Sequence, residues 1–150
     1  MNMALIIIVM GIILDRITKI WAVKTLSEGH NIVIIKDFFA FSYLENRGAA
    51  FGIMQNKQMF LILLTVAVIF AMLYYIFRSK KISLLNTISF SLIISGAIGN
   101  LIDRVYYKYV VDFILCHYKD VYYYPTFNVA DMLVVVGTVL FAICVIKEEK

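Results

Sequence analysis

Long apolar runs alternate with shorter polar segments along the chain, and four of these runs have the length of a membrane-spanning helix. They cover residues 3–23, 58–77, 82–102 and 127–146. A helix of about 20 mostly apolar residues crosses a hydrocarbon layer roughly 30 Å thick. The pattern therefore predicts an all-α polytopic membrane protein with four transmembrane helices. The first run lacks a basic amino-terminal region and a small-residue cleavage site, so we interpret it as a retained helix rather than a signal peptide.

Three segments outside the apolar runs have a β-branched and aromatic composition. Residues 32–35 and 38–44 lie between the first and second runs, and residues 105–115 follow the third. Partial alternation of such residues is typical of short strands. Ten tyrosines suit a position at the membrane interface. These segments predict a small β-structure lying on one face of the membrane.

The distribution of basic residues predicts how the chain is oriented. Five of them crowd the connection between the second and third runs or follow the fourth run: Arg78, Lys80, Lys81, Lys147 and Lys150. Connections rich in lysine and arginine stay in the cytoplasm. Both termini are therefore expected in the cytoplasm, and segments 24–57 and 103–126 are expected on the outer side.

Composition supports one integral membrane domain over residues 1–150. Of the residues, 63% are hydrophobic, whereas a soluble domain has about 45–50%. The net charge of +4 is dispersed, which does not indicate a nucleic-acid partner. Cys116 and Cys144 are expected to be free thiols. His30 and the Cys116-His117 pair match no metal-ligand spacing, so neither a metal nor another cofactor is expected.

Charged residues inside the apolar runs gather near the predicted outer face. A charge at the centre of a membrane helix costs about 2.5–3.5 kcal/mol on insertion scales, so each one requires a reason. Asp15 and Lys19 are four residues apart and share one helix face. Asp103 ends the third run, and Asp131 lies one turn into the fourth. An intrahelical ion pair is an alternative explanation for Asp15 and Lys19.

Asp103 and Asp131 are the candidate catalytic pair. Each follows an asparagine by three residues, Asn100 and Asn128 respectively. Two carboxyl groups in a low-dielectric site do not both ionise easily, so one can activate water while the other donates a proton to a carbonyl. The alternative for Asp131 is a structural role, with Asn128 as helix N-cap. A structural Asp103 would need a cationic partner such as Arg104.

Two other classes of protein compete with a peptidase. A proton-coupled transporter would use the same charged residues as a relay, but no internal repeat is visible and the acids lie near one face. A structural subunit would use them to hold helices together, and that leaves the outer β segments unexplained. Gly96 and Gly99 are expected to permit close packing of the third helix against the fourth.

Five motifs in this order resemble the lipoprotein signal peptidase family, also called signal peptidase II. They are Asp15-Arg-Ile-Thr-Lys19, Asn46-Arg-Gly-Ala-Ala-Phe51, Gly99-Asn-Leu-Ile-Asp-Arg104, Val111-Asp-Phe113 and Phe127-Asn-Val-Ala-Asp131. The resemblance implies an aspartic endopeptidase of the bacterial cytoplasmic membrane. Its substrate would be a diacylglyceryl-prolipoprotein, cut on the amino-terminal side of the lipidated cysteine.

The resemblance also assigns roles to residues. Asp103 and Asp131 match the catalytic pair. Asp112 is outside that pair, and Asp112→Asn is expected to leave substantial activity if the residue only supports the outer segment. Eight further positions match residues that shape or support the substrate pocket: Asp15, Lys19, Asn46, Gly48, Asn100, Arg104, Asn128 and Ala130. The implied fold has four helices and an extracytoplasmic β-cradle, with the active site at the outer face among membrane lipids.

Overall fold

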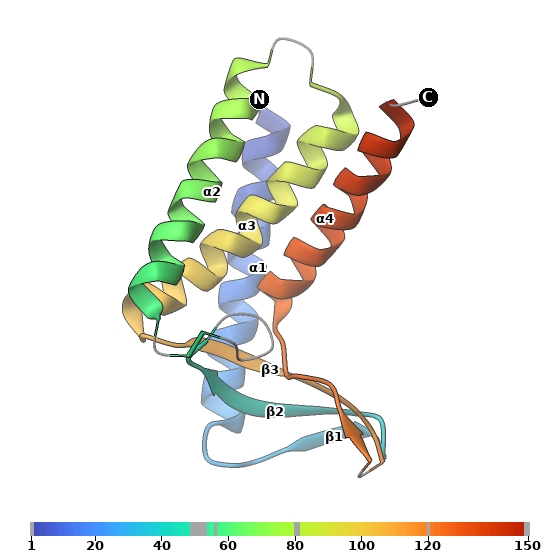
Figure 1. Ribbon diagram of the computed structural model, residues 1–150. Helices are drawn as coiled ribbons and strands as arrows, with labels where there is room; N and C mark the ends of the chain where they lie inside the picture. The colour runs from blue at the N-terminus through green and yellow to red at the C-terminus, as the bar shows by residue number, and fades with distance from the viewer. Residues whose placement is uncertain (1, 49–53, 56, 80–81, 120, 149–150) are drawn as a thin grey trace.

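The computed structural model describes residues 2–48, 54–55, 57–79, 82–119 and 121–148, and within them the chain forms four helices and four strands (Figure 1). The helices are α1 (Asn2–Leu26), α2 (Gln58–Arg78), α3 (Leu84–Tyr106) and α4 (Val129–Glu148). The strands are β1 (Ile32–Ile35), β2 (Phe39–Asn46), β3 (Val110–Tyr118) and β4 (Tyr122–Tyr123). The expectations that concern Lys80, Lys81, Lys150 and residues 49–52 lie outside the described residues.

Helix α3 is the centre of the helical layer, with α2 and α4 on either side of it (Figure 1). Its approach to α4 is close because both helices carry glycines at the crossing. A Cβ added at Gly96 would collide with the Ala130 carbonyl oxygen, and one added at Gly137 would lie 2.7 Å from the Ser89 carbonyl oxygen. A Cβ added at Gly99 would lie 2.5 Å from the Asp15 carboxylate of α1 and 3.2 Å from the Ala130 Cβ of α4. The close-packing role predicted for the two α3 glycines is confirmed.

The outer surface of the helices is apolar. α2 buries Leu61 and Ile69 but exposes side chains such as Leu63 and Phe70. Among the described residues, three helices are long and apolar enough to cross a membrane, namely Gln58–Arg78, Leu84–Tyr106 and Val129–Lys147. α1 has 25 residues, but it carries several charged side chains. The expectation of four membrane-spanning helices is therefore met for three of them.

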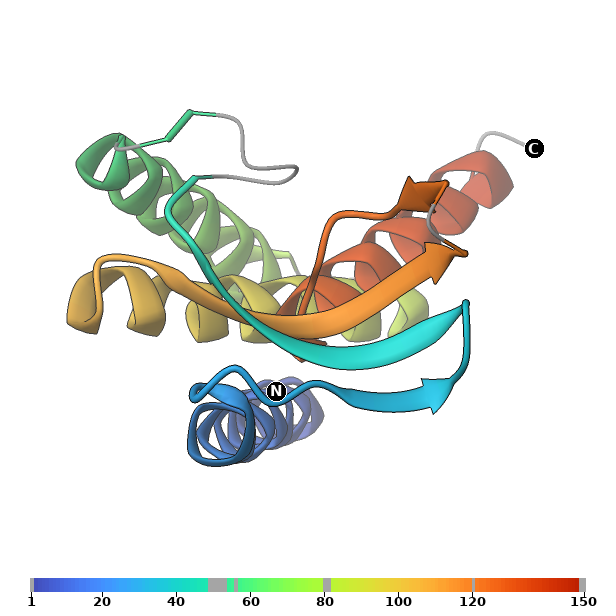
Figure 2. The same ribbon diagram turned by 90° about the horizontal axis from the view of Figure 1, so that it is seen from below.

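The four strands form one antiparallel sheet in the order β1-β2-β3-β4. It lies across one end of the helices, opposite the end that holds both termini (Figures 1 and 2). Val111 and Phe113 of β3 pack with Ala22 and Leu26 of α1 in a small apolar core. Trp21 adds edge-on contacts with Phe41 and Phe113, so the sheet is fixed to the end of α1.

The predicted strands at 32–35 and 38–44 match β1 and β2 closely. The predicted strand over 105–115 is only partly right, because α3 continues to Tyr106 and β3 begins at Val110. The Tyr107 N–H still donates to the Asp103 carbonyl, and Lys108 then adopts a φ of 66°, which ends the helix. Asp103 consequently lies within the last turn of α3 rather than at its end.

Candidate active site

The start of α4 is closed by reciprocal hydrogen bonds between Asn128 and Asp131. The Asp131 N–H donates to Asn128 Oδ1 at 2.9 Å, and the Asn128 N–H donates to Asp131 Oδ2 at 3.1 Å. This is a capping box, in which the N-cap residue and the third helical residue satisfy each other's backbone N–H groups. The predicted N-cap is confirmed, and it fixes the Asp131 carboxylate in the first turn.

Asn100 of α3 holds the second oxygen of Asp131. Its Nδ2 donates to Asp131 Oδ1 at 2.7 Å, while its Oδ1 accepts from Lys19 Nζ at 2.8 Å and from Asn128 Nδ2 at 3.2 Å. An ammonium group only donates hydrogen bonds, so the Asn100 oxygen must face Lys19 and the amide nitrogen must face Asp131. Lys19 thereby sets the orientation of the group that binds Asp131.

Asp112 of β3 reaches the same place from the sheet. Alternate side chains of a strand point to opposite faces, so Asp112 points away from the apolar core that contains Val111. Its Oδ2 accepts from Asn46 Nδ2 at 2.9 Å, and its Oδ1 accepts from Asn128 Nδ2 at 2.6 Å. Asn128 therefore contacts both Asp112 and Asp131, and it fixes their relative position.

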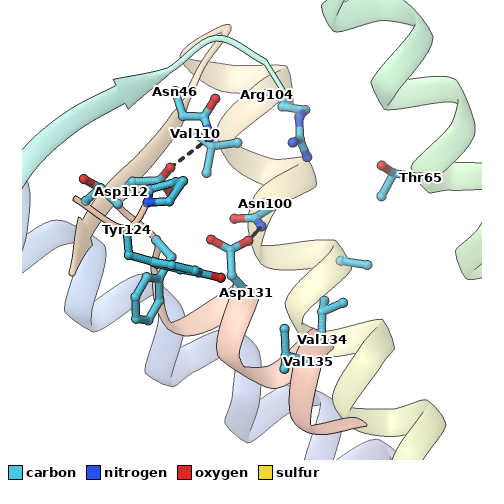
Figure 3. Close-up of a pocket in the computed structure, with 14 residues that line it drawn as sticks. Asn46, Thr65, Asn100, Arg104, Val110, Asp112, Tyr124, Asp131, Val134 and Val135 are labelled. Carbon is cyan, nitrogen blue, oxygen red and sulfur yellow. Dashed lines mark hydrogen bonds between the residues drawn. The ribbon is translucent and has the colours of Figure 1, made fainter. Parts of the chain in front are cut away.

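Asp112 and Asp131 line one cavity of about 360 Å³ (Figure 3). Its walls come from β2, β3, three helices and the segment before α4: Asn46, Thr65, Ala97, Asn100, Arg104, Val110, Asp112, Tyr124, Pro125, Thr126, Phe127, Asp131, Val134 and Val135. Polar groups surround the two carboxyl groups, whereas Ala97, Val134 and Val135 make the opposite end apolar. Arg104 also lines the cavity, and its Nη2 donates to the Gly48 carbonyl at 3.4 Å.

The environment of Asp112 favours its protonated form. Burial, reinforced by the charge of Asp131, raises the pKa of Asp112 to about 7, although hydrogen bonds from Asn46 and Asn128 and the charge of Lys19 oppose the shift. The two carboxyl groups thus interact electrostatically, and ionisation of one opposes ionisation of the other. Such a pair can hold one proton between them near neutral pH.

Asp103, by contrast, lies outside this cavity in a buried ion cluster. Its Oδ1 is 2.7 Å from Arg16 Nη1, and its Oδ2 is 2.8 Å from Lys19 Nζ and accepts from the Val111 N–H at 3.1 Å. The same two cations bind Asp15, at 2.8 Å for Arg16 and 3.2 Å for Lys19. The Ala130 N–H completes the cluster by donating to Asp15 Oδ1 at 3.1 Å.

The structure therefore changes the pairing expected from the sequence. Asp103 is fully buried and ion-paired to α1, so it does not meet Asp131 across the cavity, and Asp112 takes that place. The intrahelical pair of Asp15 and Lys19 exists, as one part of this larger cluster. The sequence did contain a feature that points to Asp112 as a site residue: it is the single acid in the apolar segment Val111-Asp-Phe113, one of the five family motifs.

The other predicted site residues divide into two groups. Asn46, Asn100 and Arg104 line the cavity. The others lie behind or beside it and hold its walls: Asp15, Lys19, Gly48, Asn128 and Ala130. All ten residues predicted for the site thus belong to one contiguous region.

The residues considered as metal ligands do not form a site. In the described part of the chain, no group of three or more His, Cys, Asp or Glu side chains is arranged to hold a metal ion. His117 Nδ1 is 2.8 Å from the Lys119 carbonyl oxygen, and its ring stacks on Tyr123. Cys116 and Cys144 are not joined in a disulfide, and Cys144 Sγ lies 3.5 Å from Ser83 Oγ.

Comparison with known proteins gives consistent matches over nearly the whole chain. The profile of the family described as signal peptidase (SPase) II matches residues 7–147. A lipoprotein signal peptidase of Clostridium tetani is 63% identical over 98% of this chain and 94% of the relative. One of Clostridium novyi is 60% identical over 99% of this chain and the full length of the relative.

Two solved structures of bacterial membrane enzymes have the same fold. One is 31% identical, with a TM-score of 0.88, and the match covers all of this chain and 91% of the other. The second is 32% identical, with a TM-score of 0.85, and the match covers 98% of this chain and 94% of the other.

Proposed function

Because this chain belongs to the signal peptidase II family and is therefore a membrane peptidase, we propose that it is an aspartic endopeptidase acting through Asp112 and Asp131. Its proposed substrate is a diacylglyceryl-prolipoprotein, cut on the amino-terminal side of the lipidated cysteine. The name lipoprotein signal peptidase, carried by its relatives, supports this substrate. The mechanism rests on one observation: Asp112 of β3 and Asp131 of α4 line the same cavity, and each carboxyl group accepts a hydrogen bond from an asparagine side chain.

The surroundings of the two acids suggest which one holds the proton. Both oxygens of Asp131 accept from N–H groups, and the residue lies in the first turn of α4, where the helix dipole favours an anion. Asp112 lies on a strand, where it has no such dipole. We assign the base to Asp131 and the proton donor to Asp112.

These roles give a balanced hydrolysis. Asp131 accepts a proton from water as the water oxygen attacks the scissile carbonyl, and Asp112 donates its proton to the carbonyl oxygen. The tetrahedral intermediate then returns that proton to Asp112 as the carbonyl re-forms. The C–N bond breaks, and Asp131 passes its proton to the departing amine of the cysteine. Both acids end in their starting states, and the step needs no metal or other cofactor.

The cavity has features that suit a lipidated precursor. Its apolar end is lined by Ala97 of α3 and by Val134 and Val135 of α4, which suits the apolar signal segment. Arg104 presents N–H donors to the cavity, and we assign it to a carbonyl oxygen of the bound substrate (Figure 3). Asn46 and Asn100 orient the two acids beside it.

The ion cluster explains how α1 can serve as a fourth membrane-spanning helix. Its 25 residues give a length of about 37 Å, which exceeds the hydrocarbon thickness. Two cations, Arg16 and Lys19, face two anions, Asp15 and Asp103, so the cluster has no net charge. We place the protein in the bacterial cytoplasmic membrane with both termini in the cytoplasm and the sheet at the outer face.

Substitution of each acid by asparagine tests the mechanism. Asp112→Asn and Asp131→Asn preserve shape, and each is expected to lower kcat at least about 10³-fold, with the double variant little worse, because the two groups act as a unit. Cleavage of a purified diacylglyceryl precursor peptide and a thermal melt would be measured in parallel. Asp37→Asn makes the same chemical change at an exposed turn and serves as the control. Near wild-type cleavage by either folded variant would overturn the aspartic pair.

A further inference from the structure

A second cavity, of about 310 Å³, adjoins the one that holds the two acids. It is lined by Leu44, Glu45, Asn46, Arg47, Gln55, Pro125 and Thr126. Asn46, Pro125 and Thr126 also line the first cavity, so the two are contiguous at the end of β2. The first cavity extends between α2, α3 and α4, whereas the second lies at the sheet and carries charged side chains.

The wall shared by the two cavities is held in place by specific hydrogen bonds. The Asn46 side chain donates to Asp112, and its Oδ1 accepts from the Gly48 N–H at 2.9 Å. The Arg47 carbonyl accepts from Gln58 Nε2 at 2.6 Å, which ties the wall to the first turn of α2. The position of the second cavity relative to the catalytic acids is therefore fixed by the fold.

The second cavity contains one ion pair that is open to exchange. Glu45 Oε2 is 3.0 Å from Arg47 Nη2, and the two side chains are 39% and 62% exposed. An exposed pair of this kind contributes little to stability, because water competes for both charges. Either partner can therefore turn to a charged group that enters the cavity.

We propose that the second cavity binds the first residues of the mature polypeptide, those that follow the lipidated cysteine. This inference rests on the proposed function, which places the scissile bond at Asp112 and Asp131. The signal segment before that bond is apolar and matches the first cavity, whereas the segment after it must leave the lipid. The two cavities share Asn46, which binds Asp112, and an extended chain advances about 3.3 Å per residue, so the proposal places the residues just after the cysteine in the second cavity. Glu45 and Arg47 would then make cleavage sensitive to charge at those residues.

The test uses diacylglyceryl precursor peptides that differ at one position. Two peptides carry lysine or aspartate at the second residue after the cysteine, and a third ends at the cysteine as an amide. Glu45→Gln is expected to lower the ratio of kcat/KM for the lysine peptide over the aspartate peptide by roughly two- to fivefold, mainly through KM. Arg47→Gln is expected to raise the same ratio by a similar factor, since it leaves Glu45 alone in the cavity.

Two control variants separate a local effect from a general one. Glu28→Gln and Lys36→Gln remove exposed charges elsewhere on the chain, and neither should change the ratio. An unchanged ratio in both cavity variants, or an equal change in the controls, would overturn the inference while leaving the peptidase intact. Cleavage of the third peptide by the wild-type protein checks the peptidase independently, and failure to cut any of the three peptides would overturn both proposals.

Discussion

Asp103→Asn is the substitution that best distinguishes two roles for Asp103: a member of the buried ion cluster, as the contacts indicate, or the catalytic partner of Asp131, as expected from the sequence. Asp103 binds Arg16 at 2.7 Å and Lys19 at 2.8 Å inside a cluster whose four charges cancel. Asparagine has nearly the same shape, but it leaves two cations facing the single anion Asp15. The variant therefore places one uncompensated positive charge in a buried site.

The cost of that charge can be bounded from the contacts. Removing one partner of a buried ion pair destabilises a protein by about 3–5 kcal/mol. The asparagine oxygen can still accept the Val111 N–H, which keeps about 1 kcal/mol of hydrogen bonding. We therefore expect a loss of about 3 kcal/mol, or a fall in Tm of roughly 6–12 °C for a chain of this size.

Restoring neutrality provides an internal check. Arg16→Gln alone leaves the cluster with a net negative charge, whereas Arg16→Gln combined with Asp103→Asn leaves one cation facing one anion. The double variant should be about 1–3 kcal/mol more stable than the sum of the two single effects predicts, because the two groups are in contact. Independent, additive effects would show that charge balance is not what Asp103 provides.

Thermal unfolding and cleavage would be measured on the same purified protein. Below its Tm, Asp103→Asn should retain reduced cleavage, since Lys19 and Asn100 still contact each other, whereas Asp112→Asn should retain almost none. The opposite result would be an inactive Asp103→Asn protein with the Tm of the wild type, together with an active Asp112→Asn protein. It would refute the structural role of Asp103 and return this residue to the catalytic pair.

Three further measurements address pH, packing and topology. Asp112 must carry its proton to act as donor, so turnover should fall as pH rises through about 7. Asn46→Ala removes a hydrogen bond that favours the ionised form of Asp112, so the pH–rate profile of this variant should show the fall at a higher pH. Gly96→Ala should lower Tm, because its Cβ meets a backbone carbonyl of α4 that cannot turn aside, and a melt equal to wild type would contradict the packing described. A single cysteine replacing Lys36 should react with an impermeant reagent added outside, whereas one replacing Ser79 should react only from the cytoplasmic side. Reversed labelling would place the two acids at the cytoplasmic face, which is the wrong side for a precursor peptidase.

The elements of this protein could be predicted from the sequence because their causes are local. The apolar runs define the helices, since each run is long enough to satisfy its backbone within a membrane. β1 coincides with the predicted strand at residues 32–35, and the α4 cap follows from Asn128 and Asp131, three residues apart. The motifs likewise identified the family, and all ten residues predicted for the site lie in one region.

What only the tertiary structure decided is which acids face each other. Asp103 and Asp112 are nine residues apart and flank the same turn. The sequence favoured Asp103 as the partner of Asp131, whereas Asp112 is the acid that lines the cavity with Asp131. Their separation depends on α1, because Arg16 and Lys19 capture Asp103, and on the direction of β3, which turns Asp112 into the cavity. Contacts between segments far apart in the chain determine how α1 is rotated about its axis and which face of β3 points into the cavity. Spacing along the sequence carries no information about those contacts, so ten residues of this region could be predicted, but the place of Asp112 beside Asp131 could not.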